Sequence, residues 1–306
     1  MEGAAPSGCA SLAHVRRFLP TTGETPVPLS PQLVRTNPVD VHRPSRHSAF
    51  IRMQPIPRYN VLGTGISAVN LATARAAILA ALATGRPGYV STADVRAVNL
   101  ATDDPVLRSH LNGSLLTTPD GMPLVWLGRF LGHRSVDRVY GPDLMLDLCA
   151  ATAGTGQTHF FVGGAPGVAE TLSRRLQERF PGLRIAGTAS PPFRPLTADE
   201  EAALFAKIAK AHPDIIWVGL SLPERERFMA RLSPKLGATI MIGVGAAFDL
   251  LSGQVRQAPR WIQRSGFEWF FRLCLEPRRL APRYLRHLPL FCFRVFTQLT
   301  RLRRYD

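Results

Sequence analysis

The fold class is indicated by residues 158–187, THFFVGGAPGVAETLSRRLQERFPGLRIAG. An apolar segment (158–162) leads through a glycine-rich turn into a helical pattern (166–180), and a second apolar segment (183–187) follows. A strand, a helix of about 10–15 residues and another strand in this order are typical of a parallel sheet. This stretch therefore predicts one strand–helix–strand unit.

The same alternation continues in both directions along the chain. On the C-terminal side, a capping box, Thr197-x-x-Glu200, opens a helix. The segments expected there are helix 197–211, strand 214–219, helix 223–236 and strand 238–242. On the N-terminal side we expect helices at 67–83, 103–111, 122–131 and 143–153, with strands at 89–92 and 114–117. The chain is thus predicted to be an α/β protein, with a Rossmann-like, mostly parallel sheet covered by helices on both faces.

The two ends of the chain differ from this central part in composition. Residues 1–57 hold nine of the 26 prolines and show no sustained period, so we expect a disordered leader there. Residues 260–306 carry eleven arginines against three acidic residues, in a chain of net charge +15, and are predicted to form a basic helical appendage. The expected division is a leader at 1–57, a catalytic α/β domain at 58–259 and the appendage at 260–306.

Composition and spacing exclude several classes of protein. With 45% hydrophobic residues the chain can bury a core, but no run reaches the ~18 apolar residues of a membrane-spanning helix. The first residues lack the pattern of a signal peptide. Neither the four cysteines nor the eight histidines have metal-ligand spacing, so we expect no metal site and no metal cofactor. The glycine-rich turns lack GxGxxG, which disfavours a dinucleotide oxidoreductase.

Small and hydroxyl-bearing residues follow the predicted strands, at the edge of a parallel sheet where ligands bind. The residues concerned are Gly163, Gly164, Ser221, Gly243 and Gly245. Any single glycine can serve only to close a tight turn. Their recurrence at one edge favours a nucleotide or sugar site.

Asp120 is the strongest candidate for chemistry that the residues alone provide. It lies in LLTTPDG, where Pro119 restricts the backbone and Gly121 permits a sharp exit from the strand. A carboxylate held at a strand end suits a general base acting on a sugar hydroxyl. The alternative is an Asx-turn or an N-cap for the helix that begins at Met122.

Arginines form the second group of candidates. Arg138 lies just before the turn Gly141-Pro-Asp143, and its planar guanidinium can hold a phosphate, unless it is an ordinary surface residue. In the C-terminal region arginines alternate with Trp and Phe, as in Trp269-Phe-Phe-Arg272. This mixture suits a membrane surface, aromatic packing against the core, or nucleic acid.

Taken together, these motifs resemble the WecG/TagA/CpsF glycosyltransferases (glycosyltransferase family 26). The resemblance covers about residues 59–290, and its motifs occur in the same order and at the same spacing as in the family. The segments that carry it include PDGMPLVW (119–126), Arg138-x-x-Gly141-x-Asp143, FVGGAPGVAE (161–170), Val218-Gly-Leu-Ser221-x-Pro223, IGVGAAFD (242–249) and Gly266-x-Glu268-Trp269 to Glu276-Pro277-Arg278-Arg279.

The resemblance implies an inverting, metal-independent hexosyltransferase of exopolysaccharide or cell-envelope synthesis. Such an enzyme moves a sugar from a UDP-sugar to a polyprenyl-diphosphate-linked saccharide. It would lie in the cytoplasm, peripherally attached to the inner face of the cell membrane. Nucleic acid is then not an expected partner. Because members of the family tend to assemble as oligomers, we expect another copy of the same chain as a partner.

Residue roles follow from the same resemblance. Asp120 is the implied general base, and the family's threonine at the first strand end falls on Thr92. The other positions implied to bind substrate are Asp94, Arg138, Gly163, Gly164, Ser221, Arg225, Gly243, Gly245 and Asp249, with Arg272, Arg278, Arg279 and Arg283 in the appendage. Guanidinium groups would stabilise the departing UDP in place of a divalent cation.

Two positions depart from the family's pattern. Asp94 stands where asparagine is usual, and Arg225 stands where glutamine is common. An arginine at this position would alter donor recognition or add a phosphate contact. The alternative function is a non-catalytic nucleotide-sugar-binding or scaffold protein with the same fold.

Overall fold

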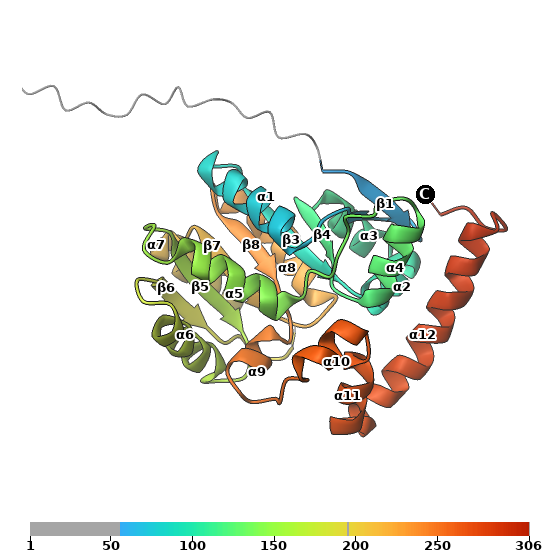
Figure 1. Ribbon diagram of the computed structural model, residues 1–306. Coiled ribbons are helices and arrows are strands. Elements are labelled where there is room, and N and C mark those ends of the chain that lie inside the picture. The colour runs from blue at the N-terminus through green and yellow to red at the C-terminus, as the bar shows by residue number, and fades with distance from the viewer. Residues whose placement is uncertain (1–55, 195, 306) are drawn as a thin grey trace, which may run out of the picture. The chain divides into compact units, whose positions relative to one another are not determined.

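A six-stranded parallel sheet is the main feature of the fold (Figure 1). The computed structural model describes residues 56–194 and 196–305. The strand order is β4-β3-β8-β7-β5-β6, and all neighbouring pairs are parallel. The strands are β3 (Gly88–Ala93), β4 (Leu116–Pro119), β5 (Thr158–Gly163), β6 (Arg184–Ala189), β7 (Ile215–Gly219) and β8 (Ile240–Gly243). The predicted α/β fold class is confirmed.

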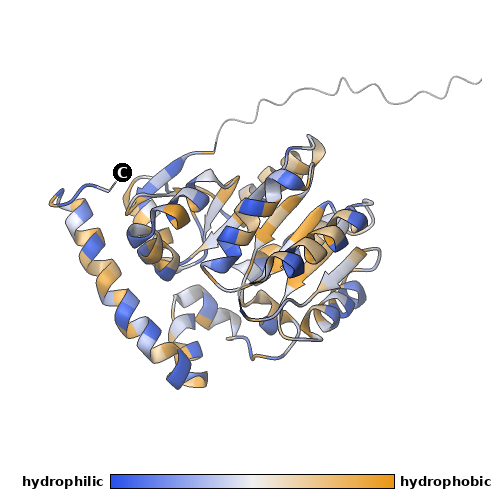
Figure 2. Cartoon of the chain, turned by 180° about the vertical axis from the view of Figure 1, so that it is seen from behind, coloured by the Kyte–Doolittle hydropathy of each residue, from blue (hydrophilic) through white to orange (hydrophobic). Residues whose placement is uncertain are grey.

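Helices cover both faces of this sheet because successive strand residues point to opposite sides. On one face Phe161, Trp217 and Ile242 are buried under α1 (Leu71–Ala83), α5 (Gly141–Thr152), α6 (Val168–Arg179) and α9 (Ala247–Leu251). On the other face Phe160 and Val218 are buried under α7 (Ala198–Ala211) and α8 (Glu224–Leu232), which η1 (Ser233–Lys235) follows. Figure 2 shows the apolar character of the central strands between these layers.

A second core lies beside β3 and β4. It involves an antiparallel hairpin, β1 (Arg58–Val61) and β2 (Thr64–Ser67), together with α2 (Val95–Asp103), α3 (Pro105–Gly113) and α4 (Met122–Phe130). Tyr59 and Ile66 of the hairpin pack with Val98 of α2 and Leu124 of α4. This core supports the two strands whose carboxyl ends carry Asp94 and Asp120.

The C-terminal residues form α10 (Arg260–Ser265), α11 (Glu268–Leu275) and α12 (Pro277–Leu299). The side chain of Asn99 in α2 donates a hydrogen bond to the carbonyl of His287 (2.8 Å), and Arg294 donates to the carbonyl of Asn99 (3.0 Å). These bonds fasten α12 along α2. Figure 2 shows polar and apolar residues mixed along the length of α12.

Several predicted boundaries need correction. The helix expected from residue 67 begins at Leu71, because Thr64–Ser67 is strand β2 and Asn70 forms the capping box with Thr73. Helix α2 was not predicted. Its end is hidden because Asp104 is both its C-cap and the N-cap of α3. The capping box at Thr197 and Glu200 is confirmed.

The predicted division of the chain stays a prediction. Residues 53–306 form one compact unit that contains both the proposed catalytic domain and the proposed appendage. The leader proposed for 1–57 lies outside the described residues, apart from its last two positions.

Candidate active site

A pocket lies at the carboxyl ends of β3 and β4, between the sheet and the C-terminal helices. Asp94 follows β3, and Asp120 follows β4. Residues of α11 and α12 complete the lining from the opposite side. The charged and polar side chains that line it are Asp94, Arg96, Asp120, Arg138, Tyr140, Glu268, Arg272, Arg283, Tyr284 and His287. Five residues that the sequence proposed for substrate binding or catalysis thus meet in one pocket.

The backbone around Asp120 explains how its side chain reaches this pocket. The Asp120 N–H donates to the carbonyl of Ala93 (2.9 Å), which extends the pairing of β3 and β4 beyond the strands. The N-cap of α4 is Gly121, with no side-chain cap hydrogen bond. The alternative interpretation of Asp120 as a helix cap is therefore wrong. About a quarter of its side chain (26%) remains exposed.

Arg138 connects Asp120 to the C-terminal helices. Its Nε donates to the backbone carbonyl of Asp120 (2.6 Å), and its Nη1 donates to Oε2 of Glu268 (2.6 Å). Its Nη2 lies 3.7 Å from Oδ1 of Asp120. The guanidinium also lies over the ring of Tyr140, 4.1 Å from its centroid, and the Tyr140 hydroxyl donates to Oε1 of Glu268 (2.6 Å). Arg138 is thus held in place by the residues around it.

Three carboxylates line the pocket, and they differ in what they can still accept. Glu268 uses one oxygen for Arg138 and the other for Tyr140. Asp94 accepts the N–H of Ala97 (2.8 Å) on Oδ1 and Nη2 of Arg283 (3.0 Å) on Oδ2. In contrast, Oδ1 of Asp120 is buried and has no hydrogen-bond partner among the described residues. Asp120 is therefore the carboxylate with spare capacity to accept a proton.

Burial raises the pKa of Asp120 to about 6, because desolvation disfavours the charged carboxylate. The positive charge of Arg138 opposes this shift, and the negative charges of Asp94 and Glu268 add to it. A general base works best when its pKa lies near the operating pH. Asp120 is ionised at neutral pH and has a stronger tendency to take up a proton than an exposed aspartate.

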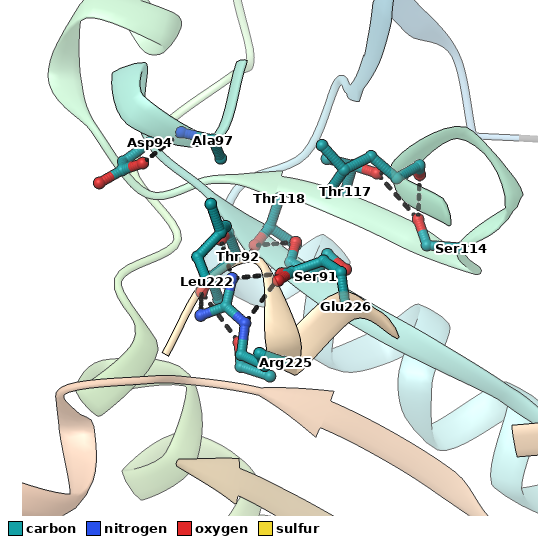
Figure 3. A network of polar contacts seen from close by, with 12 residues as sticks. Ser91, Thr92, Asp94, Ala97, Ser114, Thr117, Thr118, Leu222, Arg225 and Glu226 are labelled. Atoms are coloured by element: carbon teal, nitrogen blue, oxygen red, sulfur yellow. Dashed lines mark hydrogen bonds and ion pairs between the residues drawn. The ribbon is translucent and has the colours of Figure 1, made fainter. Parts of the chain in front are cut away.

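A second polar cluster lies deeper at the strand ends and centres on Arg225 (Figure 3). Nη1 of Arg225 donates to Oγ1 of Thr92 (3.3 Å) and its Nη2 to the carbonyl of Thr92 (2.8 Å). Its Nε donates to Oε1 of Glu226 (2.8 Å), and Thr92 in turn donates to the carbonyl of Gly243 (2.8 Å). Arg225 and Glu226 are both buried, with 6% and 0% exposure. This cluster does not belong to the lining of the pocket.

Gly243 at the end of β8 and Gly245 just after it make room for that arginine. A Cβ added to Gly243 would lie 2.8 Å from Cδ of Arg225, and one added to Gly245 would lie 3.2 Å from its Nη1. Gly163, at φ +128°, approaches the backbone of Gly219, where a Cβ would come within 2.7 Å. These contacts give the predicted glycines a packing reason that requires no ligand.

Other predicted residues lie outside the pocket lining. Gly164 packs against Val168. Ser221 is exposed in the turn after β7, and Asp249 is half-buried in α9. Arg278 is exposed, and the exposed Arg279 pairs with Glu276. The substrate-binding roles proposed for these residues stay predictions.

Sequence reasoning missed Tyr140 and Glu268 as members of the site, as well as Arg96 and His287. For Glu268 a signal existed, since it is one of only three acidic residues among the eleven arginines of 260–306. An isolated acid in a basic segment is a candidate partner for a functional arginine. Nothing comparable distinguishes His287.

The described residues contain neither a cluster of metal ligands nor a membrane-spanning helix. In 56–194 and 196–305, no three or more His, Cys, Asp or Glu side chains are grouped so as to hold a metal ion. In the same residues, none of the helices has both the length and the apolar character needed to cross a membrane.

The parallel α/β sheet, with an available carboxylate among arginines at its carboxyl edge, defines a site suited to transferring a group to a hydroxyl acceptor. Comparison with known proteins agrees with this class. The model of the glycosyl transferase WecG/TagA/CpsF family matches residues 59–305, so the chain belongs to this family and is a glycosyltransferase.

Two curated relatives carry the same name, N-acetylglucosaminyldiphosphoundecaprenol N-acetyl-beta-D-mannosaminyltransferase. The protein from Bacillus subtilis (strain 168) is 30% identical over 191 residues, which is 62% of this chain and 72% of the relative. The protein from Bacillus spizizenii (strain ATCC 23059 / NRRL B-14472 / W23) is 28% identical over the same shares of the two chains.

Proposed function

We propose that this glycosyltransferase moves a sugar from a UDP-sugar to a saccharide linked to a polyprenyl diphosphate, with inversion at the anomeric carbon. The name of the Bacillus relatives supports this class of acceptor, because it specifies N-acetylglucosaminyldiphosphoundecaprenol. It also makes the N-acetylmannosaminyl group the first donor sugar to test. The product would be an intermediate of a cell-envelope polymer or an exopolysaccharide.

Asp120 is the proposed general base. The observation that carries this assignment is that Oδ1 of Asp120 accepts no hydrogen bond from the described residues, in a pocket where each oxygen of Glu268 and Asp94 accepts one. Asp120 takes the proton of the acceptor hydroxyl, whose oxygen forms the bond to the anomeric carbon. The bond from that carbon to the diphosphate breaks, and UDP leaves with its electron pair.

Arginines of the C-terminal helices are proposed to stabilise the charge on the departing UDP. Among them, Arg272 of α11 lines the same pocket as Asp120, which supports this role. Guanidinium groups present paired N–H donors that match phosphate oxygens. In this proposal they do the work that a divalent cation does in metal-dependent transferases.

The C-terminal helices are also proposed to dock on the inner face of the cell membrane. Their exposed large apolar side chains support this, and examples are Trp261 (72%), Phe270 (52%), Leu285 (76%), Phe293 (66%) and Phe296 (59%). Aromatic side chains beside arginines favour the boundary between lipid head groups and acyl chains. Such a location would bring the pocket to a substrate that is anchored in the bilayer.

The base assignment is tested with Asp120→Asn. The amide keeps the shape of the side chain but cannot accept the proton, so transfer should fall by about 10²–10⁴-fold with the fold unchanged. The measurement is transfer of labelled sugar to a polyprenyl-diphosphate-linked acceptor, with circular dichroism as the control. Unchanged turnover would remove Asp120 as base. UDP binding by the wild type without any transfer would favour the non-catalytic alternative.

Membrane docking is tested by sedimentation with anionic liposomes. Phe293→Ser combined with Phe296→Ser should release the protein from the vesicles, because two apolar anchors are lost. Phe193→Ser is the control, since Phe193 is even more exposed (76%) but lies in the loop between β6 and α7. Equal binding by the double variant and the control would contradict docking through α12.

A further inference from the structure

One side of the pocket carries three basic side chains, two arginines and a histidine, that the proposed mechanism of transfer does not use. Arg96 comes from α2, and Arg283 and His287 come from α12. All three line the pocket that also contains Asp120. The group is therefore part of the space that the substrates enter.

Hydrogen bonds hold the side chains of Arg96 and Arg283 and the backbone of His287 in place. Nη2 of Arg96 donates to the carbonyl of Leu222 (3.2 Å), and Nη2 of Arg283 donates to Oδ2 of Asp94 (3.0 Å). The backbone of His287 is fixed by the hydrogen bond that its carbonyl accepts from Asn99 (2.8 Å). The group is thus organised before any ligand arrives.

The group has donors without acceptors and more positive than negative charge. Nε of Arg283 and Nδ1 of His287 are buried and have no hydrogen-bond partner among the described residues. Burial lowers the pKa of Arg96, and the neighbouring charge of Arg283 lowers it further. The pKa of His287 is likewise lowered by burial, and then by Arg96, Arg286 and Arg283. The two guanidinium groups are thus crowded and partly desolvated beside a neutral imidazole, and such cations are stabilised when an anion binds among them.

We propose that Arg96, Arg283 and His287 form a subsite for the diphosphate of the lipid-linked acceptor. Two guanidinium groups and an imidazole N–H offer the donors that a diphosphate needs. The acceptor's first sugar then lies between this subsite and Asp120. Its lipid leaves along α12, where the neighbouring Leu285 is 76% exposed. This assignment rests on the proposed function, and it separates the acceptor's diphosphate from that of the donor.

The experiment compares Arg96→Gln, His287→Gln and the double variant of the full-length protein in steady-state transfer. The KM for the acceptor should rise about tenfold in each single variant and more in the double variant, because each loses a donor to a charged group. The KM for the UDP-sugar should stay within about twofold. Arg286→Gln is the matched control, because Arg286 is exposed on α12 and does not line the pocket.

Inorganic pyrophosphate provides a second readout that does not depend on turnover. It should bind the wild type in calorimetry, compete with the acceptor in kinetics, and bind the double variant at least tenfold more weakly. Arg96→Lys keeps the charge and should restore part of the affinity. This partial recovery separates anion binding from a loss of folding, because the bond from Arg96 to Leu222 is altered in both Arg96 variants.

Two results would overturn the proposal. If the acceptor KM and pyrophosphate affinity are unchanged in the double variant, the subsite does not exist. If only the KM for the UDP-sugar rises, the diphosphate that binds there belongs to the donor. If the wild type transfers no sugar at all, the proposed function fails, whereas pyrophosphate calorimetry still decides whether the cations form an anion site.

Discussion

Two clusters of arginine and carboxylate lie at the carboxyl edge of the sheet, and only one of them faces the pocket. In the first cluster, Arg138 connects Asp120 with Glu268. In the second, Arg225 connects Thr92 with Glu226. The residue types are nearly the same. Asp120 of the first cluster lines the pocket, while Arg225 and Glu226 of the second are sealed under the strand ends.

The difference shows that charge by itself does not mark the reacting group. Arg225 departs from the family's pattern, and from sequence it is an equally good candidate for contact with the substrate. In the structure its guanidinium is already engaged by Thr92 and Glu226. Access to the pocket separates the proposed catalytic cluster from the one that supports the strand ends. The variants below change a member of one of these clusters or a carboxylate outside both for comparison.

The largest effect on stability is expected for Arg225→Met. The change leaves the fully buried Glu226 without its cation, which should cost about 3–5 kcal/mol of the free energy of unfolding. Unfolding in denaturant measures this loss of free energy. The double variant Arg225→Met with Glu226→Leu is the control, because it removes both charges and should recover most of the loss. A single variant within about 1 kcal/mol of the wild type would contradict a supporting role for Arg225.

Glu268→Gln should act on turnover more than on stability. The neutral amide weakens the hold on Arg138, so kcat should fall about tenfold or more. Loss of the negative charge also lowers the pKa of Asp120, so the acid limb of the pH–rate profile should move below about 6. That shift identifies Glu268 as a positioning residue, because a purely structural defect would leave the limb in place.

Glu276→Gln provides the matched control for Glu268. Glu276 is also an acidic residue of the C-terminal helices, but its carboxylate pairs with the exposed Arg279. Its loss should leave both kcat and the pH profile unchanged. Equal effects of the two variants would show that Glu268 has no specific role in the pocket.

The smallest effect on stability is expected for Asp94→Asn. The ion pair with Arg283 joins side chains that are 38% and 37% exposed, and such pairs contribute no more than about 1 kcal/mol. Asparagine also keeps the acceptor that caps α2. Thermal unfolding should therefore change little. A loss as large as that of Arg225→Met would mean that this exposed ion pair contributes as much to stability as the buried one.

The central part of the fold could be predicted from the sequence because its signals are local. Apolar segments alternate with helices, and cues such as the capping box at Thr197 mark where helices begin. The hairpin of β1 and β2 was missed because its strands have four residues each and its turn places Leu62 at a positive φ of 53°. Leucine gives no signal for such a turn.

The candidate site could be predicted only in part. Asp120 was identifiable because proline and glycine on either side define a turn at a strand end. Arg96, Tyr140 and Glu268 were not, because their importance depends on α11 and α12 returning to the carboxyl ends of β3 and β4. Only tertiary packing shows that Arg138 and Glu268, 130 positions apart, form an ion pair of 2.6 Å.

The pH dependence of sugar transfer by the wild type tests the role of Asp120 most directly. Protonation removes the capacity of the carboxylate to accept the acceptor's proton, and the raised pKa of Asp120 places this loss at about 6. The rate should therefore be level above about pH 7 and fall tenfold for each unit below about 6. A rate that stays constant from about pH 8 down to about pH 5 would contradict the assignment of Asp120 as the general base.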